Sequence, residues 1–462
     1  MQNVTNQFNV LVSLLAVFLG MAVVFVFSVK PLLRFLAGRV MNEYVSILLT
    51  DKYSQNIGEL LPSLKRYSLL NVLEMSLRAE SGQIIARPLG SPKHFLGFEN
   101  LMFSPRQMAC LPFPANAPVD MSVTLGPGAA RPMKLRIPLM IASMAYGLAL
   151  SEEAKQALAK ASDELQTAIG SGEGPVLPEE GDWAGKYILQ ISRWSWGLRT
   201  LELIAKADML EVQMGQGADM GAAPLPAAEL AGKAASLGGL MPGASTESLP
   251  APPGVDNPQD WPEFLKLLRY MAEGIPIALK LMATDYLEED LAIAVRLGFD
   301  AVILDGAQGG SHASPPIKQD DFGIPSLYAL IRARRFLADQ PVSLIVSGGY
   351  FTPGQCLKAL ALGADAVYLG TVPLFSLVHR QAEKVAPWEP LTTLVYYESP
   401  DKGKLDVALA QKSVVNVMKS MELEMAEALR ALGKTSLQEL SDKDLVALDS
   451  TTAEVTGVKR AY

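Results

Sequence analysis

The sequence predicts an α/β protein in which a single N-terminal transmembrane helix precedes a (β/α)8 TIM barrel. Three observations support this prediction. A long apolar stretch occupies residues 8–29. From about residue 137, short runs rich in Val, Ile and Leu alternate with amphipathic segments rich in Ala and Leu. Glycines directly follow several of these runs, at the strand ends where enzymes of this fold bind their ligands.

The apolar stretch 8–29 contains only one Asn and two Ser as polar residues, and a helix of about 20 such residues spans the hydrocarbon layer of a bilayer. A secretory signal would carry positive charge ahead of a shorter apolar core, but residues 1–7 have no charged side chain. Because Lys30, Arg34 and Arg39 follow the stretch, the positive-inside rule places the remainder of the chain in the cytoplasm. We therefore expect a single-pass membrane protein with a cytoplasmic catalytic domain; the alternative is a buried helix of a soluble domain.

Composition excludes several classes of function. The 462 residues are 49% hydrophobic and carry a net charge of −8, so the chain has material for a large core and lacks the basic stripe that nucleic acid requires. Its two cysteines, Cys110 and Cys356, cannot form a disulfide framework or a four-thiolate metal site. Three scattered histidines are too few for a histidine-based metal site. We expect no metal and no nucleic acid.

The barrel prediction depends on seven apolar runs, each separated from the next by a helical segment or a loop. They occupy residues 137–145, 187–192, 209–214, 277–281, 300–306, 343–349 and 365–371. Continuous apolar strands that alternate with helices of about 10 to 15 residues are typical of parallel strands covered on both faces. Seven or eight such units fit a (β/α)8 barrel better than an open sheet.

The remaining segments are placed around this barrel. An insertion at about 217–262, rich in Ala, Gly and Pro, interrupts the alternation after the run 209–214. Residues 421–448 are expected to form a helical pair outside the barrel. We predict four parts: an anchor at 1–30, an N-terminal extension at 31–130 that packs on the barrel, the barrel at 131–400, and a helical tail at 401–462.

Three successive loops carry glycine where a strand should end: DGAQGG at 305–310, SGGY at 347–350 and LGT at 369–371. Backbone N–H groups in such loops bind phosphate, helped by the N-terminus of the following helix. The last two loops occupy the usual phosphate position of this barrel. The candidate binding residues are Gly309, Gly310, Ser347, Gly348, Gly349, Gly370 and Thr371; the alternative is that these are ordinary turn residues.

Lys280 is the second informative feature, because it lies inside the apolar run IALKLM. A lysine there faces the barrel interior or its mouth and needs an anionic partner. A cation near N1 of a reduced flavin stabilises its negative charge. Lys280 is therefore a candidate cofactor-binding and catalytic residue, and a solvent-facing lysine at a strand edge is the alternative.

Small residues in SMAYG, at 143–147, could admit the face of a planar ring. The candidates there are Ser143, Met144 and Ala145. Gln190 and Gln216 lie at or beyond the ends of neighbouring strands and could bond the polar edge of such a ring. Each of these residues, taken alone, could equally be structural.

Taken in order, these segments resemble the FMN-binding synthase domain of glutamate synthase, from about Pro138 to Gly370. Residues 431–445 resemble the same family more weakly. The matching pieces are SMAYG, SGEGP, EVQMGQGAD, ALKL, DGAQGGSHASP and VSGGYFTPGQCLKALALGADAVYLGT. The resemblance implies a barrel that holds FMN, with the phosphate bound by the loops at 347–350 and 369–371. It also implies that Lys280, residues 143–145, Gln190 and Gln216 lie along the isoalloxazine, and that the loop 305–315 closes over flavin and substrate.

The sequence also departs from that family. No cysteine cluster for an iron–sulfur centre follows the run 365–371, and the predicted membrane anchor stands where long members carry a glutaminase domain. Gln213 and Asp219 occupy positions where the family has lysines. Their loss removes positive charge that a dicarboxylate would require, although Arg193 or Lys318 could replace it.

The resemblance implies an oxidoreductase of glutamate biosynthesis that acts on CH–NH2 groups. Reduced FMN would deliver hydride to 2-iminoglutarate, formed from 2-oxoglutarate and ammonia, and give L-glutamate. Ammonia would be free or supplied by a partner. Lys280 and Glu173 are the candidate catalytic residues, with Glu173 of SGEGP as the acid/base; the alternative for Glu173 is a solvent-facing turn carboxylate.

Three alternatives remain. The protein could act on another 2-oxo or 2-amino acid, with electrons from a membrane quinone or a donor protein. It could be a non-catalytic, membrane-anchored scaffold that binds FMN. The phosphate-binding barrels that resemble inosine-monophosphate dehydrogenase are the least favoured, because they need a cysteine in a loop after a strand, whereas Cys356 falls in a helical segment and Cys110 precedes the barrel.

Overall fold

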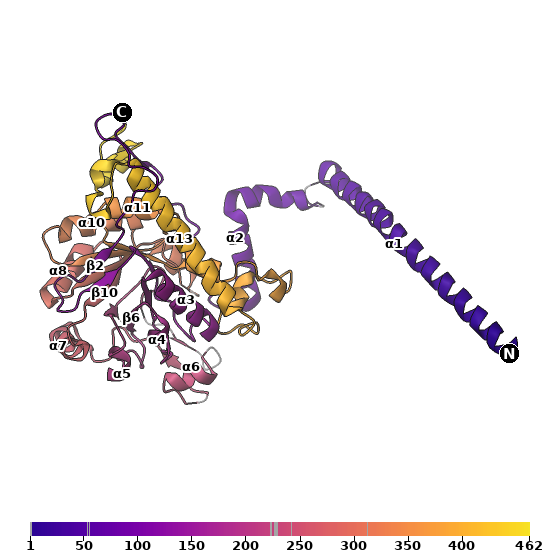
Figure 1. Cartoon of the computed structure of the whole chain (residues 1–462), viewed down its shortest axis with the longest axis horizontal. Coiled ribbons are helices and arrows are strands. Elements are labelled where there is room, and N and C mark those ends of the chain that lie inside the picture. The colour runs from indigo at the N-terminus through magenta and orange to yellow at the C-terminus, as the bar shows by residue number, and fades with distance from the viewer. Residues whose placement is uncertain are drawn as a thin grey trace. The chain divides into compact units, whose positions relative to one another are not determined.

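The computed structural model describes residues 2–462 except 53, 55, 222–223, 226–229, 242 and 312, and omits the side chains of 2–20, 22–24, 26–27 and 224. The chain divides into two compact units, residues 1–85 and 86–462. The first unit holds α1 (Gln2–Thr50), a 3-10 turn (Ile57–Glu59) and α2 (Leu60–Ser81), drawn at the indigo end of Figure 1. Helix α2 ends at Gly82, whose φ of 62° is the left-handed conformation that glycine adopts freely.

The expected membrane anchor falls on α1. Within the described part of the chain, no helix has both the length and the apolar character that crossing a membrane requires. Most side chains of residues 8–29 lie outside that part. The anchor therefore stays a prediction.

The second unit contains the predicted barrel. Eight parallel strands close on themselves in the order β10-β11-β12-β13-β4-β5-β6-β7. Figure 1 labels β6 and β10 among them. Their bounds are β4 Leu139–Ile141, β5 Ala168–Gly170, β6 Lys186–Ile191, β7 Met209–Gln213, β10 Ile277–Met282, β11 Ala301–Asp305, β12 Ser343–Ser347 and β13 Ala366–Leu369. The (β/α)8 prediction is confirmed.

Strand β5 is the barrel strand that the sequence pattern did not reveal. It is three residues long, AIG, and ends in a glycine, so it offers no apolar run of useful length. Its place is fixed by pairing on both sides, with Ile169 opposite Ile141 of β4 and opposite Tyr187 of β6. The runs at 187–192 and 209–214 are therefore the third and fourth strands of the barrel.

Helices surround the strands because each helix has one apolar face, which packs on the barrel. In α3 (Glu152–Leu165), Ala157, Leu158, Ala161 and Leu165 are buried, and the predicted cap is present, since the Ser151 hydroxyl accepts from Ala154 N at 3.2 Å. The other helices between the strands are α4 Glu180–Trp183, α5 Leu201–Ile204, α6 Gly232–Leu237, α7 Trp261–Ala272, α8 Leu287–Leu297, α9 Pro316–Asp321, α10 Ser326–Leu337 and α11 Pro353–Ala361, followed by α12 Thr371–Leu377. The insertion adds β8 (Pro224–Leu225) and β9 (Thr246–Glu247).

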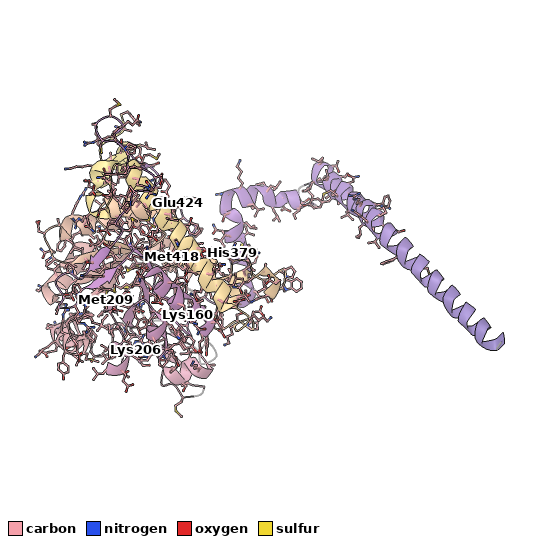
Figure 2. The ribbon with its side chains drawn as sticks, in the orientation of Figure 1. Lys160, Lys206, Met209, His379, Met418 and Glu424 are labelled. Carbon is pink, nitrogen blue, oxygen red and sulfur yellow. The ribbon has the colours of Figure 1, made fainter. Side chains whose placement is uncertain are left out.

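The C-terminal part differs from the expected helical pair. One long helix, α13 (Val407–Ala431), packs on α3 and α12. Met418 is buried on it and Glu424 is exposed, as labelled in Figure 2. The expected second helix is instead two 3-10 turns (Leu437–Glu439 and Asp442–Asp444), β14 (Leu445–Ala447) and α14 (Ser450–Thr456). Ser436 and Ser441 each cap a short turn, so the segment between them is too short for an α-helix.

A hairpin of β2 (Val123–Leu125) and β3 (Met133–Leu135) lies at the amino end of the barrel. Its Gly126 N–H donates to the Ser343 hydroxyl at 3.0 Å, and Ser343 is the first residue of β12. Strand β1 (Leu101–Phe103) pairs with β14. The opposite end, where the strands finish, is the end at which barrels of this type bind ligands.

Candidate functional site

A cavity of about 570 Å³ opens at the carboxyl end of the barrel, a volume typical of small-molecule sites. It is lined by every residue that the sequence analysis proposed as catalytic or cofactor-binding: Ser143, Met144, Ala145, Glu173, Gln190, Gln216, Lys280, Gly309, Gly310, Ser347, Gly348, Gly349, Gly370 and Thr371. The fold therefore brings together side chains that are up to 228 positions apart, since 371 minus 143 is 228. Their individual roles stay predictions.

The glycines of the SGGY loop are required by geometry. Gly348 and Gly349 have φ of 100° and 82°, which residues with a Cβ rarely adopt. A Cβ on Gly348 would lie 2.8 Å from Gly306 N, and one on Gly349 would lie 2.5 Å from the Gln308 Cβ. The loops after β11 and β12 thus approach each other with bare backbone at the wall of the cavity.

The loop 305–315 is held in place by hydrogen bonds to neighbouring segments. The Gln308 Oε1 accepts from the Ser326 amide at 2.8 Å and from its hydroxyl at 2.9 Å. The Ser326 hydroxyl lies 2.5 Å from the Gly348 carbonyl. Ser314 bonds the Ala218 carbonyl of the loop after β7. The cavity wall is therefore pre-formed.

Lys280 lies inside the barrel, 3% exposed, and its charge is met by a buried carboxylate. Its Nζ is 3.7 Å from Glu211 Oε1. The same carboxylate accepts from the Ser143 hydroxyl at 3.0 Å and from the Tyr368 hydroxyl at 2.9 Å, and it also bonds the Gln190 amide. The anionic partner that burial of Lys280 demands is thus supplied by the protein. Glu211 was not among the predicted site residues, although a lone glutamate in the apolar run MLEVQM was the available signal.

Three buried polar atoms on the cavity wall have no hydrogen-bond partner among the described residues: Gln190 Oε1, Asp305 Oδ1 and the Tyr350 hydroxyl. Burial raises the pKa of the Asp305 carboxyl, and the charge of Lys280 opposes that shift. Unpaired buried acceptors are costly unless a ligand satisfies them. FMN offers a ring N–H, ribityl hydroxyls and a phosphate, so these acceptors, the bare glycine loops and Lys280 fit it.

The cavity also contains a polar and aromatic region around Glu173. The Trp194 Nε1 donates to Glu173 Oε2 at 3.3 Å, and Trp194 stacks on Trp196 with ring centres 5.2 Å apart. The pKa of Glu173 is raised to about 7, first by burial and then by the Asp219 charge, while Arg193 and hydrogen bonds from Gln213 and Trp194 oppose the shift. Glu173 is therefore a carboxyl that can exchange a proton near neutral pH.

An N-terminal strap, residues 86–91, completes the wall. It falls within the extension 31–130 that was expected to pack on the barrel, but its place at the cavity was not predicted. Arg87 N–H donates to the Ser314 carbonyl at 2.9 Å, and Leu89 N–H donates to the Ser311 carbonyl at 3.1 Å. Leu89 and Ser91 line the cavity. This stretch has no periodic pattern, so nothing in the sequence pointed to it.

Neither cysteine lines the cavity. Cys356 is buried in α11, and that burial raises the pKa of its thiol to about 12. A nucleophilic cysteine needs the opposite shift. Among the described residues, no group of three or more His, Cys, Asp or Glu side chains is placed to hold a metal ion.

The fold and site define a (β/α)8 barrel with a glycine-lined, polar cavity at the end where enzymes of this fold bind their substrates. The chain belongs to the glutamate synthase family: residues 97–435 match the conserved region in glutamate synthase. It is 31% identical over 413 residues to a glutamate synthase large subunit-like protein of Rhizobium meliloti, covering 84% of this chain and 92% of that protein. It is also 31% identical over 347 residues to an archaeal glutamate synthase [NADPH] of Methanocaldococcus jannaschii, covering 71% of this chain and 66% of that one.

The solved structures that align with this chain are more distant. A mandelate oxidase carrying a monooxide FMN adduct aligns with a TM-score of 0.47 and 18% identity, over 74% of this chain and 86% of that one. The barrel of the present chain is established by its own strand pairing.

Proposed function

We propose that this protein is an FMN-dependent oxidoreductase of glutamate synthase type that reduces 2-iminoglutarate, formed from 2-oxoglutarate and ammonia, to L-glutamate. The observation that carries the proposal is Lys280, a buried cation on the wall of the cavity, in a chain of this family. A cation at that place stabilises negative charge on a reduced flavin. A scaffold without redox chemistry needs no cation at this place to stabilise a reduced flavin.

In this proposed reaction each group of site residues has a specific role. FMN, when bound, supplies the hydride. The amides of the loops at 347–350 and 369–371 bind the phosphate, and the free Gln190 Oε1 accepts a hydrogen bond from the polar edge of the ring. Glu173, with a pKa of about 7, delivers a proton to the substrate nitrogen as the carbon accepts hydride.

A second candidate keeps FMN and changes the substrate to another 2-oxo or 2-amino acid, with electrons from a membrane donor. It is favoured by one observation. Neither Arg193 nor Lys318, either of which could have replaced the missing lysines, is among the described residues that line the cavity.

The experiment is the absorption spectrum of the purified full chain, followed by acid release and identification of the flavin. Bound FMN that is reoxidised from its reduced form by 2-oxoglutarate plus ammonium supports glutamate synthesis. Bound FMN whose reduced form is not reoxidised by 2-oxoglutarate plus ammonium favours the second candidate. Absence of flavin after reconstitution would overturn both.

We also propose that residues 8–29 anchor the protein in a membrane, on the basis of their apolar composition and the basic residues that follow. Membrane fractions washed with alkaline carbonate should retain the full chain, because this wash removes proteins that are only peripherally bound. Release into the wash would contradict the anchor.

A further inference from the structure

The strap 86–91 is held at the cavity by hydrogen bonds and charge rather than by apolar packing. From residue 86 to residue 97, all of which the structure describes, no apolar side chain is buried, and Leu89 is 41% exposed. Leu89 also has a φ of 68°, a left-handed conformation that a residue with a Cβ adopts only where its surroundings hold it. The strap therefore depends on its polar contacts to stay in place.

One set of these contacts joins the strap to the loop 305–315. Arg87 and Ser314 bond each other through both backbone groups, with N···O distances of 2.9 and 3.2 Å. Gly90 lies so close to Gly310 that a Cβ on Gly310 would be 2.6 Å from Gly90 N. Gly310 lines the cavity. The strap thus backs the loop that forms part of the cavity wall.

A second set of contacts fastens the strap to α9. Asp320, near the end of that helix, accepts at Oδ1 from Arg87 Nη2 at 2.5 Å and from the Ser91 hydroxyl at 2.6 Å. The Arg87 Nε donates to Gln319 Oε1 at 3.1 Å, and Gln319 is fully buried. Hydrogen bonds between charged groups are stronger than neutral ones. Asp320 therefore ties both ends of the strap to a helix that is itself fixed to the protein.

We propose that Asp320 is a positioning residue: it fastens the strap 86–91, and through the strap it holds the loop 305–315 over the bound flavin. Asp320 is not among the described residues that line the cavity, so it acts through the strap. The inference rests on the proposed function, in that FMN is the ligand retained. Release of FMN then requires the strap to detach, and the bonds to Asp320 determine how often it does.

Hydrogen exchange of the full chain, followed by mass spectrometry, tests the fastening without reference to flavin. Asp320→Ala should raise the exchange rate of the segments 86–91 and 305–315 by about tenfold or more, because loss of a charged hydrogen-bond partner shifts a local opening equilibrium by about this factor. Exchange in α3 and in the barrel strands should stay unchanged. A merely structural role would instead raise exchange throughout the barrel.

The rate of FMN release tests the positioning. The full chain loaded with FMN is diluted, and the fluorescence of the freed flavin is followed with time. Asp320→Ala should release FMN about tenfold faster or more. Asp320→Asn keeps the shape of the side chain and removes its charge, so it should show a smaller increase, and it covers the case in which the alanine variant does not fold.

A matched control is Asp300→Asn. Asp300 accepts from Arg269 Nη1 at 2.5 Å, the same distance as in the pair of Asp320 with Arg87. It directly precedes β11 and so lies at the amino end of the barrel, opposite the cavity. This variant should lose stability and still release FMN at the rate of the unaltered protein.

Unchanged exchange in the strap and the loop of the Asp320 variants would overturn the fastening. Faster exchange with an unchanged rate of FMN release would overturn the positioning role, as would equal acceleration of release by Asp300→Asn. Absence of FMN from the unaltered protein would reject the proposed function and the retention of flavin with it. The exchange rates would still decide whether Asp320 fastens the strap, so the two failures are distinguishable.

Discussion

Lys280 and Glu211 form a buried charge pair between adjacent strands of the barrel, with Nζ 3.7 Å from Oε1. Their positions follow from strand register: Glu211 of β7 pairs with Ala278 of β10, and Lys280 lies two residues further along. Because side chains alternate along a strand, residues two apart share a face. Both side chains therefore point to the same side of the sheet, and Lys280 reaches the cavity while Glu211 lies behind it.

Lys280→Ala should lower stability, because it leaves the Glu211 carboxylate buried without its cation. In the protein that folds, it should weaken flavin binding or slow flavin reduction by about tenfold or more, because the cation near the ring is lost. Flavin content after purification and the rate of flavin reduction measure the effect. Lys412→Ala removes an exposed lysine on α13 and is the matched control. Unchanged flavin content and turnover in Lys280→Ala would contradict the role assigned to Lys280.

The sequence predicted those site residues that conflict with their own local sequence, and missed those whose role depends on residues distant in the chain. Lys280 was predictable because a cation in an apolar strand conflicts with its surroundings. Glu211 presents the same conflict, but its meaning depends on Ser143, Gln190 and Tyr368, which only the closed barrel brings to it. Strand β5 and the strap 86–91 were missed because pairing partners distant in sequence, rather than local pattern, define them.

Gly348→Ala should abolish or severely weaken FMN retention. The new methyl would lie 2.8 Å from Gly306 N, and alanine disfavours a φ of 100°. Gly354→Ala, in the first turn of α11, has only Thr352 Oγ1 within 4.0 Å of the new Cβ and should retain FMN fully. Flavin fluorescence released by acid from equal amounts of the two proteins gives the comparison. Normal retention in Gly348→Ala would move the phosphate site elsewhere.

The turnover of the protein should depend on a group that titrates near pH 7, which is Glu173. Burial is the largest cause of its raised pKa and the Asp219 charge is the next. Asp219→Asn should therefore move the inflection of the pH–rate profile to lower pH. A profile that keeps its inflection in this variant would show that another group is responsible.

The same carboxyl links stability to pH. Its pKa rises from an ordinary 4.5 to about 7 on folding. The folded state thus favours the protonated form, so this contribution to stability is complete below the unfolded pKa and is lost as pH rises through about 7. Glu173→Gln should flatten the fall in thermal midpoint between these pH values. An identical slope in both proteins would contradict the assignment.

Lys155 and Glu180 form a second ion pair, fully buried, with Nζ 2.6 Å from Oε1. The same ammonium donates to the carbonyls of Met144, Gly170 and Ser171, so it holds the ends of β4 and β5 at the cavity. Lys155→Met leaves the Glu180 charge buried and unpaired and should lower stability by about 3–5 kcal/mol. Denaturant titration of the full chain, followed by circular dichroism, measures this loss.

Two further variants separate the charge from the packing. Adding Glu180→Leu to Lys155→Met removes the orphaned charge and should recover much of the lost stability, since buried pairs can be replaced by apolar groups. Lys233→Met breaks an exposed pair with Glu152 and should cost less than about 1 kcal/mol. If the double variant were as unstable as Lys155→Met, the bonds to the three carbonyls, rather than the ion pair, would be what holds this corner of the barrel.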